Sequence, residues 1–281
     1  MIRTRHPARN RIDWVSRAAA IVILAGTCAS AAQPSAAGAE QAAAPIELLV
    51  LGSGGPAALG RAASSHLLLL DGQPRVLVDS GPGSFARLGE AHVSLAALEI
   101  VLLTHLHVDH AAELPGIVKA RAVSAGQPIH FEVYGPPGHA ASAGGAAYPS
   151  TRQFMSLLFG ARGAFAYLKD FSAPVSFAVA DLRGAGERGL QPFSVLRRGD
   201  LSITAVAGHH GDAPAIIYRI DYRGRSVVFS GDIDSHGLPA LETIARGARP
   251  AGVRRGRARP APLTRGAVLT AHTAARDRRP R

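Results

Sequence analysis

Short apolar runs bounded by glycine, proline and polar residues dominate the hydrophobic pattern of the chain. The run Ile46–Leu51 closes at a glycine-rich loop, and His66–Leu70 and Val76–Asp79 flank the turn Asp71–Pro74, which is typical of a hairpin. Further strands are expected at Ile100–Leu103, Ile129–Val133, Val175–Val179, Ser194–Leu196, Leu201–Val206, Ile216–Asp221 and Ser226–Phe229. Helices are expected at Ser84–Glu90, where Ser84 would cap, and at Glu113–Val123, Thr151–Phe159 and Leu238–Ala245. Groups of strands separated by helices indicate an α/β fold with two helix-covered sheets.

Composition excludes several classes of protein. Of the 281 residues, 47% are hydrophobic and 18% are charged, which excludes a disordered chain. The single cysteine, Cys28, excludes an intrachain disulfide and a cysteine-based zinc cluster. A metal site in this chain must therefore use histidine, aspartate and glutamate.

The net charge of +11 belongs to the ends of the chain. Residues 246–281 contain eleven arginines and one acid, Asp277, a net of +10. Between Glu40 and Ala245 there are 15 basic and 18 acidic residues, a net of −3. The overall charge therefore gives no argument for a phosphate-binding surface on the body of the protein, and no specific nucleic-acid partner is expected.

The N-terminus has the order of a secretory signal. A basic stretch to Arg17 precedes the apolar run Ala18–Ala25, and small residues follow at 29–32. We expect residues 1–32 to be a cleaved signal, residues 33–45 a linker, and the mature protein to be periplasmic or secreted without a membrane span. The competing interpretation is an uncleaved anchor, but the apolar run is far shorter than the ~20 residues of a membrane-spanning helix.

The strongest chemical signal is the segment Thr104–His110. Its four potential ligands, His105, His107, Asp109 and His110, follow directly after an apolar strand. Imidazole and carboxylate are natural ligands of zinc and similar divalent ions, and a strand end holds them rigidly. The alternative, a solvated histidine-rich loop, does not account for so long a motif in this position.

This H-x-H-x-D-H segment resembles that of the metallo-β-lactamase superfamily. Three further segments are similar to motifs of that family in the same order: Leu77–Gly81, Gly208–Gly211 and Phe229–Asp232. The resemblance covers about Ile46–Ala245, and Tyr218-Arg219 before the Gly-Asp turn is most similar to the branch with ribonuclease Z, arylsulfatase-like enzymes and small phosphodiesterases. It implies a four-layer αββα sandwich and a metal-dependent hydrolase.

The resemblance also implies roles for individual residues. His105, His107 and His210 would hold a first metal, Asp109 and His110 a second, and Asp232 would bridge them, so that Asp109 and Asp232 are the catalytic carboxylates. Asp79 would orient a ligand, and the motif favours His210 over His209, which becomes a neighbour. The cofactors implied are two divalent ions, Zn²⁺ before Mn²⁺ or Fe. Such ions ~3.5–4 Å apart lower the pKa of a shared water and thereby supply hydroxide at neutral pH.

Other candidates carry less weight. His236, four residues after Asp232, is expected near the rim of the site as a supporting residue. Residues 139–170 are interpreted as an insertion or lid whose aromatic residues either line a pocket or pack the insertion: Tyr148, Phe154, Phe159, Phe165 and Tyr167. The loop Gly52–Ala57 matches a dinucleotide fingerprint, but Pro56 and the strand at His66 leave no room for the helix that such a site requires.

The tail after Ala245 departs from the family pattern. Arg249–Arg281 shows no apolar periodicity, and His272 is the only histidine left to be the final ligand. The fold is therefore expected to be incomplete, with an open edge on the second sheet. The tail is either a basic arm that binds acidic partners or the product of an out-of-frame reading of the gene. The second interpretation is supported by one back-translation of Arg249–Ala261, which encodes an apolar strand when it is read one base later.

Taken together, the N-terminal segment and the family resemblance predict an exported metal-dependent hydrolase. The expected substrate is a small ester-type molecule: a phosphodiester, a sulfate ester or a related ester. The alternatives are an inactive, truncated member of the fold, a β-lactamase or lactonase, and a binding protein that acts through its basic tail. The sequence is silent on the oligomeric state.

Overall fold

The computed structural model describes residues 44–57, 59–141, 146–182 and 190–249, and the backbone of 252–254 and 268–269. The predicted signal (1–32), most of the linker, and His272 lie outside these residues. None of the described helices combines the length and apolar character needed to cross a membrane.

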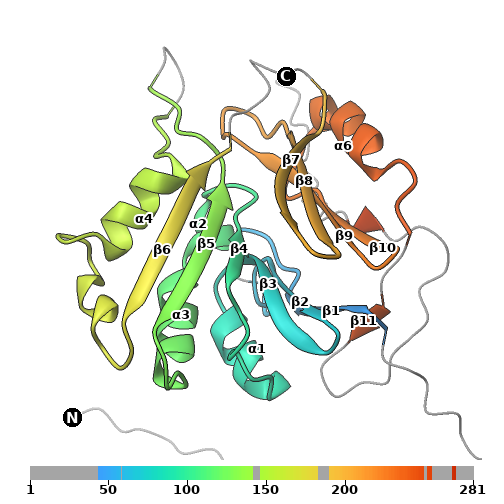
Figure 1. Ribbon diagram of the computed structural model, residues 1–281. Helices are drawn as coiled ribbons and strands as arrows, with labels where there is room; N and C mark the ends of the chain where they lie inside the picture. Colours follow the sequence, from blue (N-terminus) through green and yellow to red (C-terminus); the bar gives the residue numbers. More distant parts are fainter. Residues whose placement is uncertain are drawn as a thin grey trace, which may run out of the picture. The chain divides into compact units, whose positions relative to one another are not determined.

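Two sheets form the centre of the fold (Figure 1). The spatial order in the first sheet is β11 (Gly252–Arg254), β1 (Ile46–Gly52), β2 (Ser65–Leu70), β3 (Gln73–Ser80), β4 (Ile100–Leu102), β5 (Ile129–Gly135) and β6 (Val175–Asp181). The order in the second is β12 (Val268–Leu269), β10 (Arg225–Phe229), β9 (Ile216–Tyr222), β8 (Leu201–Ala207) and β7 (Phe193–Arg198). The expected hairpins are present, because β2 pairs with β3, and β9 with β10, in antiparallel register.

Helices cover the outer faces of both sheets (Figure 1). The first sheet carries α1 (Ser84–Ala91), α2 (Val108–Ala111), α3 (Leu114–Val123), α4 (Thr151–Phe159) and the 3₁₀ turn η1 (Ala166–Lys169). The second carries η2 (Ser235–Gly237) and α6 (Leu238–Ala245). The predicted αββα sandwich is therefore confirmed.

Alternation along the strands explains this layering. Leu67 and Leu69 of β2 pack in the core under the helices of the first sheet, whereas Leu68 and Leu70 pack in the core between the sheets. Successive strand residues point to opposite faces, so a strand buried on both sides reads as an unbroken apolar run. A smaller core joins α6 to the second sheet through Ile217 and Leu241.

The helix α1 is capped differently from the prediction. Its N-cap is Gly83, and Ser84 makes no capping hydrogen bond. The carboxylate of Glu113 instead accepts hydrogen bonds from the Gly83 and Phe85 N–H groups at 2.8 and 2.6 Å, and from the Ser84 hydroxyl at 3.1 Å. An acid from a distant segment thus replaces the local cap and complements the positive end of the helix.

Two short backbone segments of the tail each form an edge strand, one in each sheet. β11 pairs in parallel with β1, and β12 pairs in parallel with β10. The expected open edge on the second sheet is therefore wrong: Val268 and Leu269 pair with Val228 and Phe229 there. Backbone hydrogen bonding does not depend on side-chain identity, so an arginine-rich segment without apolar periodicity can still pair.

Candidate metal centre

The candidate ligands come from the ends of strands that meet at one edge of the sandwich. β3 ends at Asp79 and Ser80, β4 leads into the segment Thr104–His110, β8 leads to His210, and β10 leads to Asp232. Polar groups from four distant parts of the sequence are thereby placed next to one another. This is the arrangement that the strand-end motifs predicted.

Three imidazoles form the first group. The ring centroids of His105 and His107 are 4.7 Å apart, those of His105 and His210 are 4.9 Å apart, and those of His107 and His210 are 5.1 Å apart. One nitrogen from each ring lies within 4.8 Å of the other two. His105 is fully buried, and the other two are partly exposed, so the group opens to solvent on one side.

A second group shares His105 with the first. His105, His110 and Asp232 place one ligand atom each within 4.8 Å of one another. Nε2 of His110 is 3.4 Å from Oδ1 of Asp232 and 3.8 Å from Oδ2 of Asp109. The structure therefore brings together all six predicted ligands, with Asp232 facing both histidine segments.

A buried hydrogen-bond network fixes the imidazoles. Asp79 accepts hydrogen bonds from the Thr104 N–H and hydroxyl, both at 2.8 Å, and its Oδ2 lies 2.8 Å from Nδ1 of His110. The Thr104 oxygen is in turn 3.2 Å from Nδ1 of His105. Because the Thr104 proton goes to Asp79, we assign N–H to Nδ1 on both rings, so that Nε2 is the nitrogen that each ring presents to a metal ion.

These free nitrogens match a metal site. Nε2 of His105 and Nε2 of His110 are buried and have no hydrogen-bond partner among the described residues. A buried acceptor without a partner is costly, and a cation between the rings and carboxylates would satisfy both nitrogens. The donor set of imidazole and carboxylate suits zinc and similar divalent ions.

The electrostatics of the centre also favour a cation. Burial, with the like charge of His110 beside it, lowers the pKa of His105 to about 2, which keeps that ring neutral. Burial opposes a charge on His110 too, but Asp79 and Asp232 raise the pKa of His110 to about 10, so a metal ion bound here would take the place of the proton on Nε2. The two carboxylates therefore stabilise positive charge at this point, as a metal ligand set must.

Close backbone packing holds the ligand segments in place. A Cβ added to Gly81 would lie 2.0 Å from the Asp109 carbonyl oxygen, and one added to Gly231 would lie 2.6 Å from Cβ of Thr104. Gly231 also has a φ of 58°, which favours glycine. Across the sandwich, the buried Tyr218 hydroxyl donates to the Leu103 carbonyl at 3.1 Å.

Arg219, which follows Tyr218 in the tyrosine–arginine pair, contacts the end of α6, whereas Tyr218 contacts Leu103. Its guanidinium contacts Asp221 at 2.8 Å and donates to the Ile244 and Arg246 carbonyls at 3.1 and 2.8 Å. These carbonyls lie at the C-terminal end of α6, where a cation is favourable. Arg219 therefore joins α6 to the second sheet.

His209 and His236 lie beside the centre rather than in it. Nδ1 of His209 is 2.7 Å from Oδ2 of Asp234, and Nδ1 of His236 is 3.4 Å from Oδ1 of the same carboxylate. Partial burial disfavours the charge on Asp234, but the Gly211 N–H, the His209 ring and the His236 N–H lower its pKa to about 2. The choice of His210 over His209 agrees with this geometry.

The segment 139–170, predicted to be an insertion or lid, contributes one residue next to the candidate ligands. Tyr148 is held by paired backbone hydrogen bonds with His139 at 2.8 and 2.9 Å. Its hydroxyl donates to Asp212 at 3.2 Å and lies 3.4 Å from Nε2 of His107. Three of the other aromatic candidates pack in or against the core of the first sheet, and Tyr167 is about half exposed: Phe154, Phe159, Phe165 and Tyr167.

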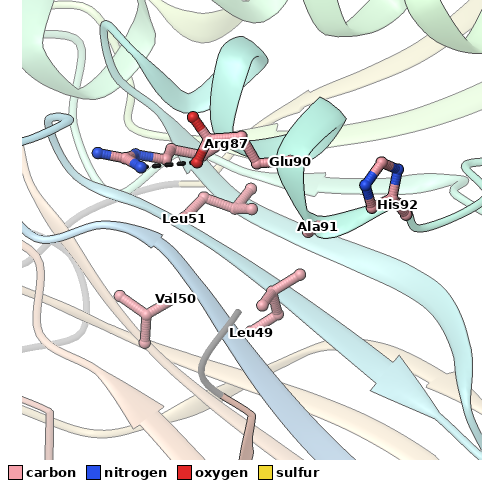
Figure 2. Close-up of a pocket in the computed structure, with 7 residues that line it drawn as sticks. All are labelled: Leu49, Val50, Leu51, Arg87, Glu90, Ala91 and His92. Carbon is pink, nitrogen blue, oxygen red and sulfur yellow. Dashed lines mark hydrogen bonds and ion pairs between the residues drawn. The ribbon is translucent and has the colours of Figure 1, made fainter. Parts of the chain in front are cut away.

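Two cavities of the described part of the chain are lined by residues other than the six candidate ligands. One has a volume of about 470 Å³ and is lined by Leu49–Leu51 of β1 and by Arg87, Glu90, Ala91 and His92 in and after α1 (Figure 2). A second, about 80 Å³ in volume, lies behind Asp79 and Thr104 and is lined in part by His66 and Phe229. Burial lowers the pKa of His66 to about 4, so this ring is neutral and structural.

Three residues of the site were not predicted from the sequence: Thr104, Asp212 and Asp234. Thr104 directly precedes the histidine motif, so its position could have been noticed. Asp212 and Asp234 each lie two residues after a predicted ligand. Their partners Tyr148 and His209 are 64 and 25 residues away along the chain, so no local pattern identifies the pairs.

An αββα sandwich with an imidazole and carboxylate cluster at one edge defines a metallo-hydrolase of one particular fold. Residues 59–250 match the model of the metallo-β-lactamase superfamily. The chain therefore belongs to this superfamily, and the predicted resemblance is confirmed.

Similar proteins of known family agree with this assignment. Ribonuclease Z of Mycobacterium marinum is 32% identical over 208 residues, which cover 72% of this chain and 68% of the relative. Ribonuclease Z of Mycobacterium avium is 32% identical over 206 residues, with the same coverage. The human tRNase Z short form aligns with a TM-score of 0.53 at 21% identity, covering 69% of this chain and 73% of that protein, which supports the fold.

Proposed function

We propose that this protein hydrolyses phosphodiester bonds with the help of two divalent metal ions, zinc in the first instance. The observation that carries the proposal is the convergence of six potential ligands around two buried, unpartnered imidazole nitrogens. His105, His107 and His210 would hold one ion, Asp109 and His110 the other, and Asp232 would lie between them. Bound ions of this kind activate water and polarise the substrate oxygen.

The residues around the candidate ligands fix the orientation of the imidazole rings. Asp79 accepts the Nδ1 proton of His110 and, through Thr104, fixes the ring of His105. Such outer hydrogen bonds hold the tautomer that presents Nε2 to the ion. Tyr148, whose hydroxyl lies 3.4 Å from Nε2 of His107, would contact a substrate bound at the first group of ligands.

The phosphodiester preference rests on the relatives. Both mycobacterial relatives are named ribonuclease Z, and such an enzyme cleaves phosphodiester bonds in RNA. Those names weigh against the expectation of no specific nucleic-acid partner, although the body between Glu40 and Ala245 is net acidic. We propose a small phosphodiester as the substrate, with RNA as the second candidate. Sulfate esters remain the third member of the predicted ester class.

Export is a separate part of the proposal. It is supported by the order of basic, apolar and small residues in 1–32. Fusion of these residues to a reporter that is active only outside the cytoplasm tests it. Reporter activity that disappears when Ile21 and Ile23 are changed to aspartate is expected, and an inactive fusion would contradict export.

A substrate panel with zinc-reconstituted protein tests the chemistry. Bis(p-nitrophenyl) phosphate, p-nitrophenyl sulfate, a cephalosporin and a short RNA are compared, with His210→Ala as the test variant and exposed His130→Ala as its matched control. Turnover of the phosphodiester that is lost only in His210→Ala is expected. Turnover confined to the sulfate or the cephalosporin would overturn the substrate class. No turnover with metal bound would favour the inactive alternative.

A further inference from the structure

A second cluster of metal-ligating side chains lies outside the central site. One ligand atom from each of His209, Asp234 and His236 lies within 4.8 Å of the other two. The rings of His209 and His236 have centroids 4.9 Å apart and flank the same carboxylate. Among the described residues, this is the cluster of imidazole and carboxylate groups that the central site does not use.

The local backbone prepares Asp234 for this position. Asp234 caps the 3₁₀ turn η2 by accepting the His236 N–H at 2.9 Å, and it accepts the Gly211 N–H at 3.2 Å. The carboxylate is thereby fixed between the segment that follows β8 and the segment that follows β10. Each oxygen keeps lone-pair capacity beyond these bonds, because an ionised carboxylate offers about four acceptor sites.

The two imidazoles are accessible to a cation from solvent. The side chains of His209 and His236 are 48% and 76% exposed, and Asp234 is 37% exposed. The distance of 2.7 Å between Nδ1 of His209 and Oδ2 of Asp234 is that of a hydrogen bond. Zinc with N and O ligands at about 2.0–2.2 Å requires a separation wider by about half an ångström, which an exposed ring can provide by turning.

We propose that His209, Asp234 and His236 form a third binding site for a zinc-type divalent cation, separate from the central pair. Two nitrogens and one oxygen favour zinc, cobalt or nickel over magnesium or calcium, which prefer oxygen. The site has open positions and exposed ligands, so it binds more weakly than the central site. An ion here links the loops that carry His210 and Asp232. The proposal does not depend on the proposed function.

Metal counting on the full chain tests the site. Protein stripped with a chelator is dialysed against rising Zn²⁺, and bound metal is measured by mass spectrometry. The test variant is His236→Ala, which removes one exposed ligand and leaves the backbone bond to Asp234. The matched control is His92→Asn, another exposed histidine that lies outside both clusters. Wild type and His92→Asn are expected to bind one equivalent more than His236→Ala at saturation.

A second measurement reports on the ligands directly. Cobalt(II) in a site with open positions absorbs in the visible range, and the wild-type spectrum should contain a weakly bound component that His236→Ala lacks. Equal zinc stoichiometry and identical cobalt spectra in wild type and His236→Ala would overturn the proposal. Failure of the central site would instead appear as a lower count in both proteins, with the difference of one equivalent retained.

Discussion

At the residue scale, Asp79 contacts His110 and Thr104 in the way expected of a residue that orients a ligand without being one. It is buried, contacts His110 and Thr104, and has a φ of 58°. Asn tolerates this backbone conformation, so Asp79→Asn removes the charge without adding strain. We expect the variant to fold and to bind its more weakly held central zinc ion about 10–100-fold less tightly. Competition with a chromophoric chelator measures this, and unchanged affinity would contradict the role of Asp79.

His66 gives a pH-dependent prediction at the same scale. Its pKa falls from 6.5 unfolded to about 4 folded because burial disfavours the charged ring. The unfolded chain therefore binds more protons between these values, so stability present above pH 6.5 is lost as pH falls toward 4. The loss amounts to about 3 kcal/mol from this residue.

Replacement of His66 by leucine isolates this contribution. Urea unfolding at pH 7 and pH 4.5 should show a smaller loss of unfolding free energy in His66→Leu than in wild type, by about 2–3 kcal/mol. The comparison cancels contributions from His105 and His210, whose pKa values are also lowered by burial. An equal loss in both proteins would show that His66 is not the buried neutral ring described above.

At the scale of elements, the turn after β10 packs directly on the strand that leads to the histidine motif. Alanine at Gly231 would collide with Thr104, whereas alanine at Gly224, whose φ of 72° is also positive, meets open space. Both substitutions should cost about 1 kcal/mol in backbone strain. Only Gly231→Ala should also lose bound zinc, as measured by metal analysis. Zinc retained in Gly231→Ala would show that this contact does not position Asp232.

The elements themselves were largely predictable, and the contacts between them were not. The apolar runs located the strands from β1 to β10 because burial on both faces leaves a strong local pattern. The cap of α1 by Glu113 and the link from Asp212 to Tyr148 depend on residues 28 to 64 positions apart. Only the folded chain brings such pairs together, so no local rule finds them.

At the scale of the whole molecule, the tail supplies one edge strand to each of the two sheets. Deletion of residues 250–281 removes β11 from β1 and β12 from β10. We expect the shortened protein to melt at least about 2–4 °C lower and to self-associate through its exposed edges. Deletion of 270–281 alone, beyond β12, is the matched control and should have little effect. Identical melting and light scattering for all three proteins would contradict a structural role of the tail.

The sequence also placed the central site within the whole molecule. Its six candidate ligands come from segments that span residues 105 to 232, and the family resemblance of the motifs was enough to group them. The surface cluster at Asp234 was only partly anticipated, since His209 and His236 were expected as neighbours of the site. Its shared carboxylate became evident only from the fold, because η2 turns His236 back toward His209.

Anomalous diffraction at the zinc edge, from crystals of the reconstituted protein, tests the central claim most directly. We predict strong peaks within bonding distance of His105, His107 and His210, and of Asp109, His110 and Asp232. Well-ordered crystals that show these side chains without an anomalous peak among them would contradict the account.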